Sequence, residues 1–285
     1  MTGRPQLPLP AGGHRPTTGV TRFAPAPTGF LHLGHVVNAL LVWGWARAKG
    51  AAVRLRIEDH DRQRSRPDYE RAILDDLAWL GFDPDGPPVR QSDREEVYRA
   101  ALACLVDQGL VYGCACTRAD LQQVSPGLDA ERRYPGTCRS RNLGLADGLG
   151  WRVRLDPGEE RFQDRLLGPQ VQDPATQCGD LLIRDRLGNW TYQFAVVSDD
   201  LEQGITHVIR GADLLASTGR QIRLARLLGR SEAPDYSHHP LVMKSPHEKL
   251  SKSDGATGVR DFRAAGWSAG DVLAHARGLA RLPRI

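Results

Sequence analysis

The hydrophobic and polar positions follow their clearest pattern in residues 21–50. A short strand at 22–24 leads into a loop in which two prolines and a glycine, between residues 25 and 29, prevent the strand from continuing. From about Leu33 the apolar residues recur near the 3.6-residue period of a helix, and Gly50 is a typical helix end. The segment is therefore predicted to form a strand, a loop and a helix.

Further along the chain, strand-like and helical patterns alternate. The expected strands are 52–59, 206–210 and 241–243, and the expected helices run from about 68 to 80, from Asp93 to Gly109 and from about 214 to 228. Residues 180–185 and 190–194 are expected to pair as a hairpin, followed by an acidic turn at Asp199 and Asp200. Because helices separated by strands usually cover a parallel sheet, a doubly wound α/β fold is the default architecture.

The pattern changes at Leu110, where short strands such as 151–155 and many turns replace the regular alternation. We therefore expect an α/β protein with a Rossmann-type doubly wound parallel sheet, an inserted α+β subdomain that contains zinc, and a short helical C-terminal extension. The expected divisions are a disordered tail at 1–19, the two halves of the Rossmann domain at 20–110 and 191–240, the insertion at 111–190, and a loop with C-terminal helices at 241–285.

Length and composition narrow the class of protein. With 285 residues and 40% hydrophobic composition the chain can bury a large core, and no apolar run approaches membrane-spanning length. The first nineteen residues lack the apolar centre of a signal peptide, so a cytoplasmic protein is expected. The net charge of +4 gives no polybasic signature, and any contact with nucleic acid must come from local patches.

The lysines are unevenly distributed. Of the 38 basic residues only Lys49, Lys244, Lys249 and Lys252 are lysine, and the last three lie within nine positions. Lysine is a compact charge on a flexible stem, whereas arginine is a rigid fork. The polar segment 244–258 is therefore predicted to be a functional loop that follows moving phosphates.

Two histidines lie where the helix near Leu33 begins. His32, Gly34 and His35 fall in its first turn, and a helix N-terminus after a parallel strand presents free N–H groups to an anion. The pattern predicts a phosphate site, although a helix start with incidental histidines fits it equally well. Glu58, beyond the next strand, is similarly ambiguous between a ligand group and a solvated acidic loop.

Three of the five cysteines form a cluster. Cys114 and Cys116 are followed after seventeen residues by Tyr134 and after three more by Cys138, which gives three soft ligands and one phenol for a tetrahedral zinc site. Glu131 is a rival fourth ligand, and buried structural thiols are the alternative to a metal site. Cys104 and Cys178 are expected to be packing residues.

The motifs together resemble a known family. HLGH at 32–35 and KLSKS at 249–253 match the two signatures of class I aminoacyl-tRNA synthetases. The surrounding segments RFAPAPTGFLHLGH, LRIEDHDRQRS, TYQFAVVSDD, THVIRGADLL and KLSKSDGA closely resemble the glutamyl-tRNA synthetase group over most of residues 21–258. Only 32 residues follow Ser253, fewer than the roughly 100 of a further domain, so the chain resembles the truncated glutamyl-Q tRNA(Asp) synthetase family.

The resemblance implies an AMP-forming ligase. Members of that family activate L-glutamate with ATP to glutamyl-adenylate without tRNA, and then transfer the glutamate to the queuosine base at the wobble position of tRNA(Asp). The implied partners are thus ATP, glutamate and queuosine-containing tRNA(Asp), the implied cofactors are one structural Zn²⁺ and the Mg²⁺ that accompanies ATP, and the expected state is a monomer. The family's zinc pattern also matches Cys114, Cys116, Tyr134 and Cys138.

The resemblance also assigns roles to residues. For ATP and catalysis it implies His32, Gly34, His35, Lys249 and Lys252, and for glutamate it implies Arg22, Phe23, Ala24, Pro25, Ala26, Glu58, Tyr192 and Arg210. Taken alone, Tyr192 is more consistent with a core residue and Arg210 with a surface cation.

Two positions depart from the glutamyl-tRNA synthetase pattern. Ala26 replaces a serine and Val196 replaces a frequent asparagine, so we expect a less polar pocket and weaker glutamate binding than in the full-length enzymes. Three alternatives stay open: a short glutamyl-tRNA synthetase that charges a tRNA 3′ end, a non-catalytic RNA-binding relative, and a small H-x-G-H nucleotidyltransferase that adenylylates cofactors.

Overall fold

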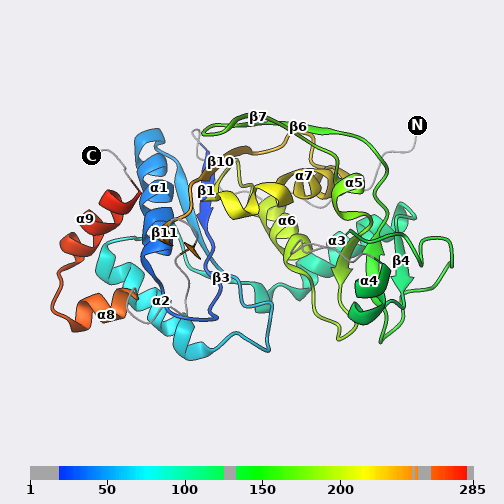
Figure 1. Ribbon diagram of the computed structural model, residues 1–285, viewed down its shortest axis with the longest axis horizontal. Coiled ribbons are helices and arrows are strands. Elements are labelled where there is room, and N and C mark those ends of the chain that lie inside the picture. Colours follow the sequence, from blue (N-terminus) through cyan, green and yellow to red (C-terminus); the bar gives the residue numbers. More distant parts are fainter. Residues whose placement is uncertain (1–18, 125–132, 246–247, 250–257, 281–285) are drawn as a thin grey trace.

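The computed structural model describes residues 19–124, 133–245, 248–249 and 258–280. It is an elongated molecule, with helices α1, α2, α8 and α9 at one end and α3, α4 and strand β4 at the other (Figure 1). Among the described helices, none is both long and apolar enough to cross a membrane.

A parallel sheet lies at the centre of the fold. Strands β1 (Val20–Phe23), β2 (Ala52–Ile57) and β3 (Val89–Arg90) pair in the order β1-β2-β3, and β9 (His207–Gly211) pairs in parallel with β10 (Asp235–His239). The N–H of Thr206 donates to the carbonyl of Val20 at 2.9 Å, which brings β9 beside β1. The resulting order β3-β2-β1-β9-β10 confirms the predicted Rossmann-like parallel sheet.

The helices of the first half form as their sequences predict. Helix α1 (Leu33–Lys49) buries Val36, Leu40 and neighbouring apolar residues against β1 and β2, and ends at Gly50 with φ 61°. Helix α2 (Pro67–Leu80) likewise ends at Gly81 with φ 78°. Glycine adopts this left-handed conformation without a Cβ penalty, which is why both helices stop there.

The segment after α3 (Glu95–Asp107) contains two small antiparallel units. Strands β4 (Val111–Cys114), β5 (Gly150–Val153) and β8 (Leu181–Arg184) form one sheet, accompanied by the short helices α4 (Arg118–Val124) and α5 (Pro174–Cys178). The hairpin of β6 (Glu160–Asp164) and β7 (Gly168–Gln172) instead joins the main sheet, because β6 runs parallel to β10 (Figure 1). A strand from within the predicted insertion thus pairs with the main parallel sheet.

The hairpin prediction for residues 180–194 was correct for its first strand and wrong for its second. After β8 a single bridge joins Arg184 to Trp190, and helix α6 (Tyr192–Glu202) begins at Tyr192. Phe194 and the three residues after it are all buried, so the helix shows no polar face from which its period could be recognised. The predicted acidic turn is also wrong, because Asp199 and Asp200 lie inside α6.

The remaining elements complete the second half and the C-terminal part. A 3₁₀ helix η2 (Ala212–Ser217) precedes α7 (Thr218–Leu227), so the α-helix starts four residues later than predicted. Strands β11 (Met243–Ser245) and β12 (Glu248–Lys249) pair with each other, and β11 lies two residues beyond the predicted strand. Strand β10 was not predicted. Helices α8 (Val259–Ala264) and α9 (Ala269–Leu279) follow.

Helix α2 carries a buried carboxylate, Asp76, that is expected to make stability depend on pH. Its oxygens accept no hydrogen bond within the described part of the chain, and the nearest cation is Arg260 of α8, whose Nε lies 3.8 Å from Oδ1. Burial raises the pKa of Asp76 to about 6, with Arg260 and Arg263 opposing the rise. A raised carboxyl pKa contributes stability at acid pH that is lost as pH rises through about 6, because the charged form must then stay buried.

We therefore expect Asp76→Asn to increase the free energy of unfolding by about 2–3 kcal/mol at pH 7.5 and to leave it nearly unchanged at pH 4. Urea unfolding at the two pH values measures the difference. Asp75 is the matched control, since it neighbours Asp76 on α2 but is 66% exposed, and Asp75→Asn should change stability by less than about 0.5 kcal/mol. Equal effects of the two substitutions would contradict the buried-charge explanation.

Candidate active site

The two histidines of HLGH cap helix α1. His32 is the N-cap residue, and its Nδ1 accepts the N–H of Gly34 at 3.1 Å. The Nδ1 of His35 accepts the N–H of His32 at 3.1 Å, and the two ring centroids lie 3.9 Å apart. Because each Nδ1 accepts a backbone N–H, a neutral ring carries its proton on Nε2. Both imidazoles are therefore arranged as Nε2–H donors at a helix start, a geometry suited to phosphate oxygens.

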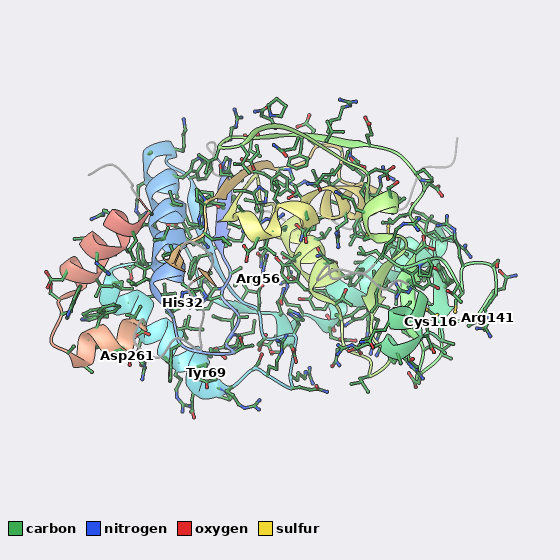
Figure 2. The ribbon with its side chains drawn as sticks, viewed as in Figure 1. His32, Arg56, Tyr69, Cys116, Arg141 and Asp261 are labelled. Carbon is green, nitrogen blue, oxygen red and sulfur yellow. The ribbon has the colours of Figure 1, made fainter. Side chains whose placement is uncertain are left out.

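The lysine loop is joined to this helix start through the backbone. Gly258, the last residue of the loop, forms an antiparallel bridge with His32, and the N–H of Val259 donates to the carbonyl of Leu31 at 2.9 Å. The backbone of Lys249 lies in β12, whereas Lys252 lies outside the described residues. The chain at the C-terminal end of the loop is thus held beside the start of α1, where Figure 2 labels His32.

Four of the residues predicted to bind glutamate lie on separate elements around the parallel sheet. Arg22 is on β1, Glu58 follows β2, Tyr192 begins α6 and Arg210 is on β9. Burial raises the pKa of the Tyr192 hydroxyl, the charge of Glu58 raises it further, and those of Arg210 and Arg22 lower it. The charges of Glu58, Arg210 and Arg22, together with that of Asp200, therefore all act on the same phenol.

The predicted loop residues differ in what they can offer. Phe23 is buried in the core with its ring centroid 5.5 Å from that of Trp43, so only its backbone is available to a ligand. The carbonyl of Pro25 accepts the N–H of Glu58 at 3.0 Å, which fixes the loop against the end of β2. Ala24 and Ala26, on either side of Pro25, are partly exposed.

A network of buried charged side chains, which the sequence did not predict, contacts Arg22 and Glu58. Asp200 Oδ1 accepts Arg22 Nε at 3.2 Å and Arg56 Nη1 at 2.8 Å. Asp199 accepts Arg94 Nε at 2.5 Å, and its Oδ2 lies 3.7 Å from Arg56 Nε. Arg56, labelled at the centre of Figure 2, is fully buried, and the surrounding carboxylates raise its pKa despite the opposing effect of burial. The network holds Arg22 in one position by its Nε.

Glu58 lies at the edge of this network. Its Oε1 is 3.6 Å from Arg56 Nη2, and burial raises the pKa of the carboxyl group although Arg56 and Arg22 oppose the rise. Within the described residues its one ion pair is this long contact with Arg56, so the buried carboxylate is an available partner for an ammonium group. The sequence offers little signal for its partner, because Arg56 alternates with the apolar residues of β2 in the same way as the half-buried Arg54.

The cysteine cluster has the composition of a metal site. The ligand atoms of Cys114, Cys116 and Cys138 all lie within 4.8 Å of one another. The hydroxyl oxygen of Tyr134 accepts the N–H of Cys138 at 2.7 Å and lies 3.5 Å from Cys114 Sγ, so the phenol faces the thiols. Three soft donors and one oxygen fit a tetrahedral Zn²⁺ ion. Glu131, the rival fourth ligand, lies outside the described residues.

The cluster is remote from the histidines. Figure 2 shows Cys116 at the opposite end of the molecule from His32. A metal ion held here would therefore stabilise the subdomain rather than act on a ligand at the helix start. Cys104 and Cys178 are buried outside the cluster, and the thiol of Cys178 donates to the carbonyl of Pro174 at 3.1 Å.

Gly179 determines how Tyr134 approaches the thiols. It has φ 66° and ψ −157°, a region that essentially only glycine occupies, and a Cβ at this position would lie 2.1 Å from the carbonyl oxygen of Tyr134. The N–H of Tyr134 donates to the carbonyl of Cys178 at 2.9 Å, so the two segments cannot separate without loss of that bond.

We expect Gly179→Ala to lower the free energy of unfolding by about 3 kcal/mol and to weaken the predicted binding of Zn²⁺ at the cluster. Elemental analysis after gel filtration and urea unfolding measure the two effects. Gly136→Ala is the matched control: Gly136 also has positive φ, 88°, but a Cβ there meets no atom within 4 Å, so only the backbone strain of about 1 kcal/mol remains. If both variants bind the same amount of zinc, the close approach of Gly179 to the backbone of Tyr134 does not position the Tyr134 side chain.

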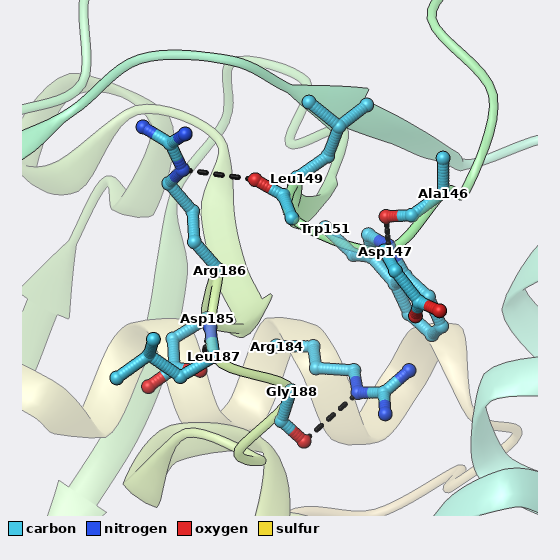
Figure 3. A pocket seen from close by; sticks show the side chains of 10 residues that line it. Ala146, Asp147, Leu149, Trp151, Arg184, Asp185, Arg186, Leu187 and Gly188 are labelled. Carbon is cyan, nitrogen blue, oxygen red and sulfur yellow. Dashed lines mark hydrogen bonds between the residues drawn. The ribbon is translucent and has the colours of Figure 1, made fainter.

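One pocket lies on the subdomain side of the molecule, between the turn after β8 and the segment before β5 (Figure 3). Trp151 donates its indole N–H to Ala146, and the guanidinium of Arg184 lies 4.3 Å from the Trp151 ring centroid while its Nε donates to Gly188. None of the predicted ATP or glutamate residues lines this pocket. It is therefore separate from the site at the sheet edge.

Comparison with known proteins agrees with this architecture. Residues 19–281 match the family described as tRNA synthetases class I (E and Q), catalytic domain. The parallel sheet and the capped helix start of this chain thus belong to a class I tRNA synthetase catalytic domain.

Individual relatives narrow the family. The Glutamyl-Q tRNA(Asp) synthetase of Bordetella bronchiseptica is 47% identical over 242 residues, covering 83% of this chain and 76% of that protein. The protein of the same name from Cupriavidus metallidurans is 48% identical over 243 residues, covering 82% and 77%. The chain therefore belongs to the glutamyl-Q tRNA(Asp) synthetase family and is a ligase-type enzyme.

A solved structure shares the fold. The glutamate tRNA ligase from Elizabethkingia meningosepticum, determined in complex with its amino acid, superposes with a TM-score of 0.72 at 30% identity. The match covers 88% of this chain and 53% of the ligase, so the chain spans about half the length of that relative.

Proposed function

We propose that this enzyme activates L-glutamate with ATP to glutamyl-adenylate without tRNA, and that it transfers the glutamate to the queuosine base of tRNA(Asp). The family membership and the names of the relatives support the reaction class. The observation that supports the proposal is that Arg22, Glu58 and Arg210 lie near enough to Tyr192 for their charges to shift the pKa of its hydroxyl. Asp200, the fourth charge that acts on this phenol, is already bound by Arg22 and Arg56. Arg22, Arg210 and Glu58 then match the two carboxylates and the ammonium group of glutamate.

The first step joins two substrates that must be positioned. The glutamate α-carboxylate attacks the α-phosphorus of ATP, the bond to the bridging oxygen breaks, and pyrophosphate leaves. The Nε2–H groups of His32 and His35 donate to the phosphates at the start of α1, and Lys249 and Lys252 stabilise the charge that develops on pyrophosphate. Mg²⁺ accompanies ATP as its counterion.

In the glutamate pocket, the arginines bind the carboxylates and Glu58 binds the ammonium group. Asp200 fixes Arg22 at 3.2 Å, so Arg22 needs little reorganisation when a carboxylate arrives. In the second step a hydroxyl of the queuosine cyclopentene ring attacks the glutamyl carbonyl, and AMP leaves. Replacement of serine and asparagine by Ala26 and Val196 supports weaker glutamate binding than in full-length glutamyl-tRNA synthetases.

The cysteine cluster is proposed to hold one structural Zn²⁺ ion through Cys114, Cys116, Cys138 and Tyr134. The distances among the thiols and the orientation of the phenol support this ligand set. When bound, the ion would fix the segment after β4 to the segment around Tyr134. A monomer in the cytoplasm remains the expected form of the protein.

Glutamate-dependent exchange of radioactive pyrophosphate into ATP, measured without tRNA, tests the first step. We expect exchange with glutamate and none with glutamine or aspartate. Absence of glutamate-dependent exchange would overturn the activation reaction and would favour a non-catalytic RNA-binding relative or a cofactor nucleotidyltransferase.

Transfer of labelled glutamate to defined tRNAs tests the second step. The substrates are queuosine-containing tRNA(Asp), the same tRNA without queuosine, and tRNA(Glu). We expect label only on the first, and we expect periodate, which cleaves the diol of queuosine, to prevent it. Labelling of tRNA(Glu) would instead identify an enzyme that charges the 3′ end.

A further inference from the structure

Arg210 is held by a set of buried neutral groups. It is 4% exposed, and its Nε donates to His238 Nε2 at 2.9 Å. Its Nη1 donates to Gln221 Oε1 at 2.7 Å, and its Nη2 donates to Thr218 Oγ1 at 2.9 Å and, less closely, to the carbonyl of Leu214 at 3.4 Å. No carboxylate among the described residues forms an ion pair with it. A buried guanidinium that lacks a counterion is suited to an anionic ligand.

His238 in turn is held by Asp164. The two residues are fully buried, and His238 Nδ1 lies 2.5 Å from Asp164 Oδ2. Asp164 also accepts the N–H groups of Leu166 and Leu167 at 2.9 Å, in the turn of the β6–β7 hairpin. These backbone hydrogen bonds therefore fix the position of the Asp164 carboxylate independently of His238.

The protonation of His238 follows from its partners. Arginine only donates, so His238 Nε2 must carry a lone pair towards Arg210, and its proton must lie on Nδ1, towards Asp164. Burial, with Arg210 adding to it, lowers the pKa of His238 to about 4, so the ring stays neutral at physiological pH. The other groups that face the ring are the Thr218 hydroxyl, the Tyr236 ring and His239.

The three residues come from three adjacent strands. His238 on β10 is in register with Arg210 on β9, and Asp164 on β6 is in register with Tyr236 on β10. Asp164 belongs to the segment that the sequence assigns to the insertion. The hairpin therefore contributes a buried carboxylate directly behind the amino-acid pocket.

We propose that Asp164 and His238 are positioning residues, which fix Arg210 to receive a carboxylate of the amino-acid substrate. This inference rests on the proposed function, since it takes Arg210 as a ligand of glutamate. Asp164 fixes the tautomer and orientation of His238, and His238 binds Arg210 through Nε. Because no carboxylate in the described part of the chain pairs with Arg210, its full charge remains for the substrate.

The test compares four variants in glutamate-dependent ATP–pyrophosphate exchange. Asp164→Asn and His238→Leu should raise the KM for glutamate by about 10–100-fold, the effect of losing one hydrogen bond to a charged group, and should leave the KM for ATP within about twofold of the native value. In Asp164→Asn the amide can donate to Nδ1, which moves the proton to Nε2 against the Nε–H of Arg210.

His238→Gln provides the rescue and His207→Leu the control. The amide oxygen of glutamine can accept the Nε–H of Arg210, so His238→Gln should stay within about threefold of the native KM for glutamate. His207 is also buried, and its Nε2 is hydrogen-bonded to Ser237 on the neighbouring strand. Its ring stacks on Trp45 and does not contact Arg210. His207→Leu should lower the melting temperature without a change in either KM. Unchanged glutamate KM in Asp164→Asn and His238→Leu, or an equal rise in the KM for ATP, would overturn the proposal.

A second measurement needs no activity and so separates this inference from the proposed function. Nitrogen-15 NMR of the histidine side chains should show the His238 proton on Nδ1 in the native protein and a shift towards Nε2 in Asp164→Asn. A native His238 that carries its proton on Nε2 would overturn the proposal. If the native protein gave the expected tautomer but no glutamate-dependent exchange, the proposed function would fail, and the binding role of Asp164 and His238 would fail with it.

Discussion

Replacing Asp200 with asparagine is expected to lower the free energy of unfolding by about 3–5 kcal/mol at pH 7.5, because it removes the carboxylate that two buried guanidinium groups share. Asp200 Oδ1 lies 3.2 Å from Arg22 Nε and 2.8 Å from Arg56 Nη1, and both arginines are at most 5% exposed. Asparagine keeps the shape but leaves these positive charges poorly compensated. Urea unfolding measures the loss.

The pH dependence gives the prediction a second readout. The pKa of Asp200 is lowered because Arg22 and Arg56 outweigh the effect of burial. A lowered carboxyl pKa contributes stability that is present above the pKa of the unfolded chain and is lost as pH falls through the folded value. The difference between native protein and Asp200→Asn should therefore be full above about pH 5 and should narrow below about pH 4.

Glu202 is the matched control for Asp200. It lies on the same helix and also binds an arginine, Arg94, at 2.6 Å, but it is 37% exposed. Glu202→Gln should cost less than about 1 kcal/mol, since solvent screens the pair. If the two substitutions cost the same, Asp200 does not compensate buried charge. Because Arg22 is also a proposed glutamate ligand, Asp200→Asn should further raise the KM for glutamate.

Elements whose signals are local could be predicted from the sequence. Helices α1 and α2 have one apolar face and end at Gly50 and Gly81, both of which adopt positive φ. Their limits follow from a few neighbouring residues, and the prediction was correct to within one residue. Strand β2 was predictable for the same reason, because its apolar residues alternate over six positions.

Helix α6 could not be predicted in this way. Its apolar run from Phe194 to Val197 is buried on every side, so the sequence shows no amphipathic period. Asp199 and Asp200 look like a solvated turn in the sequence, yet they are stabilised inside the fold by arginines more than 100 positions away. A contact of that sequence separation leaves no local trace.

The residues of the candidate site likewise fall into two groups, those that local motifs predict and those that depend on long-range contacts. His32, His35 and Lys249 belong to motifs whose residue types and order are recognisable, and the resemblance added Arg22, Tyr192 and Arg210. The residues that hold them, such as Arg56 and His238, have ordinary sequence surroundings. His238 meets Asp164 across 74 positions, so its role follows only from the pairing of β6 with β10.

Replacing Lys252 with methionine is expected to lower kcat for glutamate-dependent ATP–pyrophosphate exchange by about 100–1,000-fold, while the KM for ATP changes by less than about threefold. Pyrophosphate gains charge as its bond to the α-phosphorus breaks, so a lysine that follows it acts more on the transition state than on bound ATP. The bridge between His32 and Gly258 supports this placement, because it anchors the end of the lysine loop to the proposed phosphate site.

Matched substitutions show whether the loss belongs to this lysine. Lys49→Met makes the same change at an exposed position at the far end of α1, and its kcat should equal that of the native enzyme. Lys249→Met should cost about tenfold, because Lys249 assists Lys252 rather than replacing it. Lys252→Arg should recover only part of the activity, since a planar fork follows a moving phosphate less well than a flexible ammonium. A Lys252→Met enzyme within threefold of the native kcat would remove the lysine loop from the chemical step and leave His32 and His35 as the phosphate ligands.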